Sequence, residues 1–125
     1  ANCPFCHRFW EAARPWVDSG KVQLRHLFVV VIKADSPAKA AAILEADDPS
    51  AALLENEKNF ARGGIKPASS ISSRAQRILD ENQQLMQTTG FRGTPGIVVR
   101  ERDGLIRKFN GMPRPEQMAE VMGPR

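Results

Sequence analysis

The sequence is poor in the features that mark several large classes of protein. Among its 125 residues there are only two cysteines, which excludes a scaffold held together by several disulfides. Glycine and proline number 9 each, too few for a collagen-like or low-complexity chain. The longest unbroken apolar run covers residues 27–32 and is too short to cross a bilayer. What remains is an ordinary hydrophobic content of 42%, enough for one buried core in a chain of domain size.

Aromatic residues are also few, at 6%, and the net charge is a modest +4. A nucleic-acid-binding surface combines clustered basic residues with interleaved aromatic side chains. Most of the excess positive charge lies in residues 91–125, where basic residues alternate with acidic ones, as at Arg100, Glu101, Arg102 and Asp103. We therefore expect a solvated face in this region and no nucleic-acid partner.

Hydrophobic periodicity and breaker residues predict one α/β domain. Ser36-Pro37 and Asp48-Pro49 are typical helix starts, with a capping side chain followed by a proline of the first turn. The apolar residues of 27–32 are typical of a strand covered on both faces. The predicted order is a helix over 3–18 that Pro15 should kink or end, a strand over 22–32, helices over 38–46, 50–62 and 73–89, a hairpin of 97–99 with 105–109, and a short last helix that Pro115 opens.

Cys3-Pro4-Phe5-Cys6 is the feature that carries chemistry. Two thiols three residues apart at a helix start lie within disulfide reach, and the unpaired N–H groups and partial positive charge there favour a thiolate. Cys3, at the positive end and outermost, is the predicted nucleophile. Cys6, one turn further, is the predicted resolving thiol that attacks a mixed disulfide on Cys3. Pro4 suits the first turn, where its missing N–H costs nothing.

Two other interpretations of the cysteine pair are weaker. A zinc site needs four ligands, and beyond the two thiols the sequence has only His7 and His26. A purely structural disulfide would close so short a loop that it would restrict the unfolded chain little.

The second notable segment is Gly93-Thr94-Pro95-Gly96, directly before an apolar strand. Its X-Pro bond is of the kind that can be cis, although the segment alone indicates only a turn.

Taken together, these motifs resemble the disulfide-isomerase branch of the thioredoxin superfamily, over nearly the whole chain. The matching segments are 2–6, Phe9-Trp10, 13–25, 31–33, Ser36-Pro37, 40–44, 80–82, Leu85-Met86 and 93–95. The resemblance implies a thioredoxin-like fold over 1–125 with an inserted helical region at about 34–89. It implies Cys3 as nucleophile, Cys6 as resolving thiol and Pro95 as a cis-proline facing them, with Thr94 presenting backbone groups to an extended substrate. Pro4 and Phe5 are the other expected substrate contacts.

The resemblance also carries expectations about partners and compartment. It implies a periplasmic protein that isomerises wrong disulfides or reduces oxidised single cysteines in protein substrates, and that a membrane thiol reductant keeps reduced. No cofactor is expected besides the redox-active Cys3–Cys6 disulfide, and no metal. A homodimer is expected only through an N-terminal domain that this chain lacks. The strand that should lead into Cys3 is expected upstream, so the chain is interpreted as a fragment.

The sequence departs from the family pattern at two site positions. Phe5 stands where the family usually has Tyr, and Gly96 stands where Ala is usual, which predicts a looser loop. Two other functions remain open. A DsbA-like dithiol oxidant usually has Val before the cis-proline, whereas Thr94 is typical of the isomerase branch. A redox-inert, chaperone-like binding domain is disfavoured by the two intact cysteines.

Overall fold

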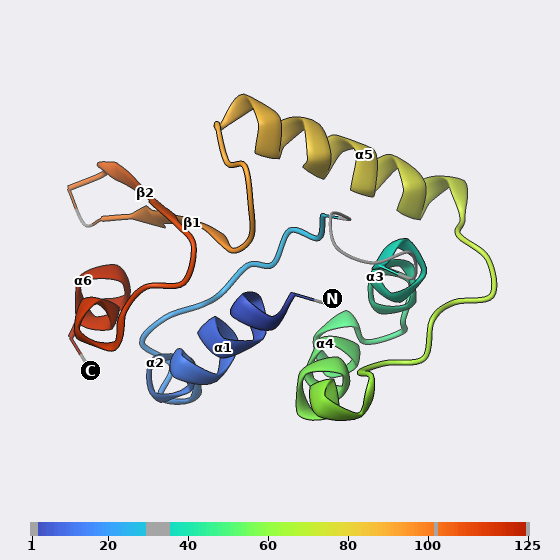
Figure 1. The fold of residues 1–125 in the computed structure, drawn as a ribbon, viewed down its shortest axis with the longest axis horizontal. Coiled ribbons are helices and arrows are strands. Elements are labelled where there is room, and N and C mark those ends of the chain that lie inside the picture. Colours follow the sequence, from blue (N-terminus) through green and yellow to red (C-terminus); the bar gives the residue numbers. More distant parts are fainter. Residues whose placement is uncertain (1–2, 30–35, 102, 125) are drawn as a thin grey trace. The chain divides into compact units, whose positions relative to one another are not determined.

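The computed structural model describes residues 3–29, 36–101 and 103–124 (Figure 1). The chain divides into two compact units. One unit spans residues 27–90, and the other joins residues 3–26 to residues 91–125. Because the cysteine motif and the Thr94–Pro95 segment both belong to the second unit, that unit is described first.

The predicted helix over 3–18 is divided into two. Helix α1 covers Pro4–Ala12 and helix α2 covers Arg14–Asp18, with Ala13 between them. Pro15 lies in the first turn of α2, where it cannot donate a hydrogen bond back into α1. The predicted effect of Pro15 is thereby confirmed. The chain then leaves α2 at Gly20, whose φ of +79° favours glycine.

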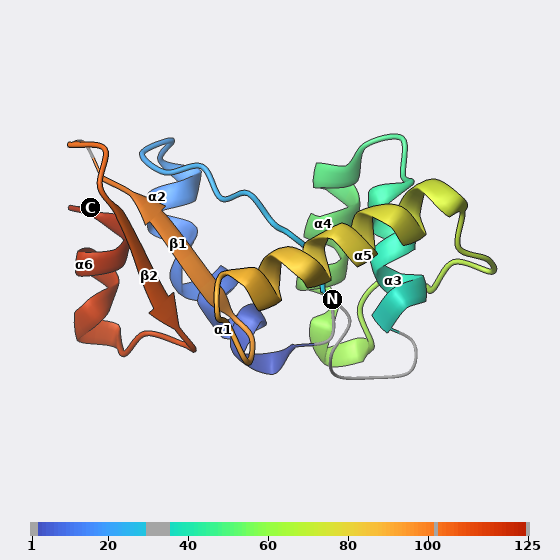
Figure 2. The same ribbon diagram turned by 90° about the horizontal axis from the view of Figure 1, so that it is seen from above.

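A hairpin and a short helix complete this unit. Strands β1 (Gly96–Arg100) and β2 (Ile106–Asn110) pair antiparallel, with Val98 opposite Lys108. The 3-10 turn η2 (Pro115–Gln117) leads into α6 (Met118–Met122). Figure 2 shows the two strands side by side, with α6 next to β2. The predicted hairpin and its Asp103-Gly104 turn are confirmed, and Gly104 has a φ of +86°.

The core of this unit lies between the helices and the inner face of the hairpin. Its centre is Trp16, which is 3% exposed and donates from Nε1 to the Gly123 carbonyl at 2.8 Å. The other buried members are Phe9, Ala13, Met118, Val121 and Met122. Strand residues 97, 99 and 109 pack against them, and so do Val22 and Leu24. The alternation at the start of the predicted strand therefore does place those two apolar side chains inward.

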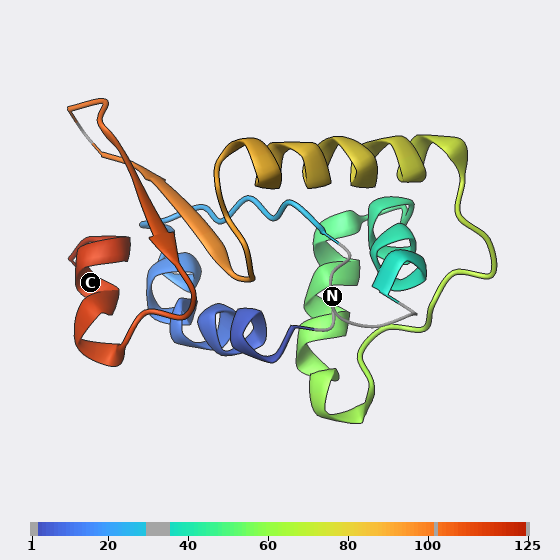
Figure 3. The same ribbon diagram turned by 45° about the horizontal axis from the view of Figure 1, so that its top comes forward.

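The other unit is helical over its described residues (Figure 3). It contains α3 (Ser36–Leu44), α4 (Pro49–Lys58), the 3-10 turn η1 (Phe60–Arg62) and α5 (Ser73–Thr88). Asp48 caps α4 by accepting from Ala51 N at 3.1 Å, and Ser72 caps α5 by accepting from Ala75 N at 3.1 Å. Helix α3 packs against both α4 and α5. The predicted helix over 50–62 is thus α4 followed by η1.

The predicted strand over 22–32 is wrong for residues 22–29, and residues 30–32 lie outside the described residues. No strand is formed over 22–29, and Leu27 is 62% exposed rather than covered. An apolar, β-branched run becomes a strand only where a neighbouring strand takes up its N–H and C=O groups.

Within the described residues, no helix is long and apolar enough to cross a membrane.

Candidate active site

The first turn of α1 places both thiols. Cys3 is the N-cap residue, with extended backbone angles, and Pro4 occupies the first turn as predicted. The Cys6 backbone N–H donates to Cys3 Sγ at 3.1 Å, so the sulfur occupies the position that a capping oxygen usually takes. His7 N donates to the Cys3 carbonyl at 3.0 Å. Both cysteines are free thiols in this structure.

A second donor reaches the same sulfur from a distant part of the chain. The Thr94–Pro95 peptide bond is cis, as predicted. The Thr94 hydroxyl donates to Cys3 Sγ at 3.1 Å. Pro95 accepts from Gly111 N at 2.9 Å, which ties the segment to the end of the hairpin. Cys3 Sγ therefore accepts from the helix end on one side and from the cis-proline loop on the other.

The two sulfurs differ in their surroundings. Burial, followed by its hydrogen bond with Cys3, raises the pKa of the Cys6 thiol to about 12. Cys6 therefore keeps its proton at neutral pH until its environment changes. The prediction that Cys3 is the outermost thiol is wrong, because Cys3 is 7% exposed and Cys6 is half-buried. The N-cap position turns Cys3 Sγ back over the first turn of α1, and its two donors distinguish it better than exposure does.

Phe5 is an exposed side chain of the motif. It is 52% exposed, and the Arg8 guanidinium lies 5.3 Å from its ring centroid. An exposed aromatic ring beside a thiol offers apolar surface to an approaching chain. That Phe5 and Pro4 contact substrate stays a prediction, as it does for Thr94 and Pro95.

His7 is engaged along its own helix. Its Nε2 lies 3.0 Å from Glu11 Oε1, and its ring stacks on Trp10 at a centroid distance of 6.0 Å. Trp10 also receives the Arg14 guanidinium, 4.0 Å from its ring centroid. Across the described ranges, no group of three or more His, Cys, Asp or Glu side chains is arranged to hold a metal ion.

Two contributions to the site have no signal in the sequence spacing. One is the Thr94 hydroxyl, since only backbone groups of that residue were expected to act. The other is Phe91, whose ring covers Gly96. A Cβ at Gly96 would lie 2.7 Å from Phe91 Cγ. The absent side chain at Gly96 makes room for an aromatic ring that packs on the loop, and the looseness of the loop stays a prediction.

Charged side chains of the hairpin and of α6 form a solvated network. Arg107 lies 3.1 Å from Glu101 and 2.5 Å from Glu120. The hydrogen bond with Glu120 contributes most, followed by that with Glu101, and both raise the pKa of the Arg107 guanidinium above its ordinary value. This pairing of alternating charges agrees with the predicted solvated face.

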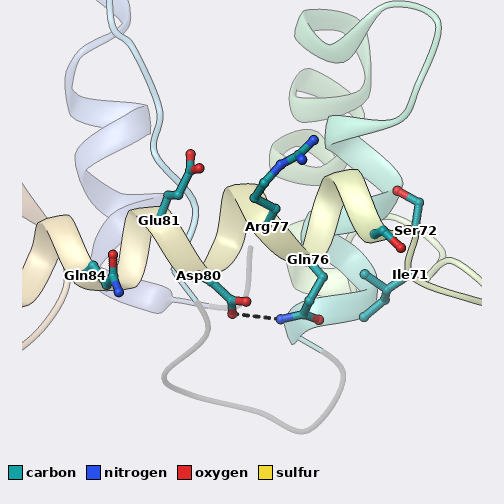
Figure 4. A pocket seen from close by; sticks show the side chains of 8 residues that line it. Ile71, Ser72, Gln76, Arg77, Asp80, Glu81 and Gln84 are labelled. Carbon is teal, nitrogen blue, oxygen red and sulfur yellow. Dashed lines mark hydrogen bonds between the residues drawn. The ribbon is translucent and has the colours of Figure 1, made fainter.

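An open groove lies in the helical unit, along α5 (Figure 4). It has a volume of about 560 Å³, and Gln76 Nε2 donates to Asp80 Oδ1 at 2.9 Å on its wall. Ile71, Arg77 and Glu81 are among the other lining residues. None of its lining side chains is a thiol, so this groove offers no residue for thiol chemistry.

The asymmetry between the thiols predicts which of them is alkylated first. With the reduced protein at mildly acidic to neutral pH, iodoacetamide should modify Cys3 well before Cys6. The reason is that two donors converge on Cys3 Sγ, whereas the pKa of Cys6 is raised to about 12. Peptide mapping by mass spectrometry measures both sites in one sample. Equal or reversed labelling would contradict the assignment, and labelling of the unfolded protein in urea is the control for intrinsic reactivity.

Two curated proteins are similar to the chain over nearly its whole length. No family model matches the chain. It is 44% identical over 124 residues to the thiol:disulfide interchange protein DsbG of Pseudomonas aeruginosa, covering 99% of this chain. It is 39% identical over 121 residues to DsbG of Escherichia coli, covering 97% of this chain. The chain resembles DsbG. The predicted resemblance to the disulfide-isomerase branch is thereby confirmed.

The match covers nearly all of this chain but only part of each relative. The chain spans about half the length of these two DsbG proteins, 48% and 49%. The structure of Proteus mirabilis ScsC in a compact conformation matches with a TM-score of 0.75 over 97% of this chain and 76% of that chain. At 17% identity this likeness concerns the fold alone. The fold is thioredoxin-like, as predicted.

Proposed function

We propose that this chain catalyses thiol–disulfide exchange on protein substrates, as an isomerase or reductase. The observation that carries the proposal is the convergence of Cys6 N and Thr94 Oγ1 on Cys3 Sγ, both at 3.1 Å. An anionic sulfur accepts such hydrogen bonds more strongly than a thiol does, and the thiolate is the attacking species. The DsbG names of the relatives support the same chemistry.

The first step forms a mixed disulfide. The Cys3 thiolate attacks one sulfur of a substrate disulfide, that S–S bond breaks, and the other substrate sulfur leaves as a thiolate that takes up a proton from water. The bond between Cys3 and the substrate replaces the bond that was broken, so no electrons are gained or lost overall. The Thr94 hydroxyl and the N–H of Cys6 hold the attacking sulfur before this step.

The mixed disulfide can be resolved in two ways. In isomerisation, another thiolate of the substrate attacks the substrate sulfur of the mixed disulfide and releases Cys3 reduced. In reduction, Cys6 loses its proton and attacks Cys3 Sγ, the substrate leaves with two more electrons, and a Cys3–Cys6 disulfide forms. The raised pKa of Cys6, about 12, disfavours the second route, because Cys6 must lose its proton before it attacks. We propose a membrane thiol reductant that returns the pair to the dithiol.

The proposal includes the periplasm as the compartment. Protein disulfides persist in oxidising compartments, of which the bacterial periplasm is one, so substrates of this chemistry are found there. A second function, as a DsbA-like oxidant, would use the same two thiols in the opposite direction. Thr94 rather than Val before the cis-proline favours the isomerase direction.

Refolding of a scrambled disulfide protein tests the proposal. The reduced protein, at catalytic amounts and without added glutathione, should speed recovery of native substrate severalfold over background. Faster disulfide transfer from the oxidised protein to a reduced substrate, without isomerisation, would support the oxidant instead. Absence of both activities would leave a redox-inert binding domain. The same protein with both thiols alkylated is the matched control.

A further inference from the structure

The ring of Phe91 occupies the space in which a side chain at position 96 would lie. A Cβ built on Gly96 would be 2.7 Å from Phe91 Cγ, 2.8 Å from Cδ1 and 2.9 Å from Cδ2. Carbon atoms in favourable contact are about 3.5–4.0 Å apart, so no larger residue fits while the ring stays in place. Gly96 is not among the glycines with positive φ. Contact with the ring, rather than backbone conformation, therefore requires glycine here.

This contact lies at the point where the cis-proline loop enters the hairpin. Gly96 pairs with Asn110 as the first residue of β1, and Pro95 accepts from Gly111 N at 2.9 Å. Phe91 in turn has the Lys108 ammonium group 5.9 Å from its ring centroid. The segment is thus in contact with the end of β2 and with the Phe91 ring. Thr94, which donates to Cys3 Sγ, lies two residues before the covered glycine.

We propose that Phe91 is a positioning residue for the active site. Its ring, seated on Gly96, holds the 94–96 segment so that the Thr94 hydroxyl reaches Cys3 Sγ. This inference rests on the proposed function for its importance to exchange, but the contact itself lies entirely within one unit of the chain. In this proposal Phe91 and Gly96, five residues apart, together control the hydrogen bond from Thr94 to Cys3 Sγ.

The test compares two alanine substitutions in the same loop. Gly96→Ala places a methyl group in the Phe91 ring, whereas a Cβ at Gly93 meets nothing within 4 Å and its φ is also not positive. The readout is the pH profile of Cys3 alkylation, followed by mass spectrometry on the reduced protein. Gly93→Ala should match the wild-type profile. Gly96→Ala should slow alkylation near neutral pH about tenfold and shift the profile to higher pH, as expected for loss of one hydrogen bond to a charged group.

A size exchange distinguishes positioning from general damage. Phe91→Ala alone should shift the profile in the same direction, because the loop loses the ring that holds it. In the Phe91→Ala, Gly96→Ala double variant the new methyl group fills part of the vacated space, so the profile should return toward wild type. The proposal is wrong if the alkylation profile of Gly96→Ala matches that of Gly93→Ala. It is also wrong if the profile of the double variant is no closer to wild type than that of Gly96→Ala. Should Gly96→Ala fail to fold, a wild-type profile for Phe91→Ala alone would overturn it.

Alkylation also separates this proposal from the proposed function. It reports on Cys3 alone and needs no disulfide substrate. A wild-type protein that does not exchange disulfides would refute the function while the coupling between positions 91 and 96 could still be measured. An active wild-type protein whose profile ignores both positions would refute only the positioning role.

Discussion

The Cys3→Ser variant is expected to lose disulfide exchange, with a fall in rate on the order of a thousandfold or more, to the uncatalysed background. A serine hydroxyl at this position can accept the same two hydrogen bonds but cannot form a stable bond to a substrate sulfur. The measurement is the rate of native-substrate recovery from scrambled disulfides. Retained activity in this variant would contradict the assignment of Cys3 as nucleophile.

The Cys6→Ser variant is the matched comparison because it changes the other thiol of the same turn. Here the first attack should persist, while release through a Cys3–Cys6 disulfide is blocked. A mixed disulfide between Cys3 and substrate should therefore accumulate, visible on non-reducing gels and reversed by dithiothreitol. If Cys6→Ser is inactive and Cys3→Ser accumulates the adduct instead, the two roles are exchanged.

The Trp16→Ala variant is expected to lower the free energy of unfolding of the thiol-bearing unit by about 3–5 kcal/mol. Trp16 is 3% exposed at the centre of the core that joins α1, α2 and α6, so its removal leaves a large cavity. It also leaves the Gly123 carbonyl without the indole N–H that donates to it at 2.8 Å. Urea unfolding followed by circular dichroism measures the loss.

Two further substitutions show whether burial is the cause. Trp16→Phe keeps an aromatic ring but not the indole donor, so it should lower the free energy of unfolding less than Trp16→Ala does. Trp10, on the neighbouring helix, is half-buried and stacked with Arg14 and His7, so Trp10→Ala should cost clearly less than Trp16→Ala. Comparable losses at the two tryptophans would show that Trp16 is not the centre of the core.

Local chemistry explains why much of the molecule was predictable from sequence. Asp48 caps α4 as predicted, and Ser72 caps α5 in the same way, each accepting a backbone N–H group within its own first turn. The Asp103-Gly104 turn and the break at Pro15 are likewise decided by a few neighbouring residues. For the same reason the place of Cys3-Pro4-Phe5-Cys6 at the start of a helix was predictable from the motif itself.

Local sequence patterns therefore predicted the helices, the hairpin, the cysteine pair at a helix start and the resemblance to the disulfide-isomerase branch. The remaining features depend on contacts between distant segments. Whether 22–29 forms a strand depends on a hydrogen-bonding neighbour, which an apolar run cannot specify. The Thr94 hydroxyl reaches Cys3 from 91 residues away, and the Phe91 ring selects glycine at 96 through a packing contact. Contacts of this kind leave no periodicity in the chain, because they depend on how separate segments fold together in space.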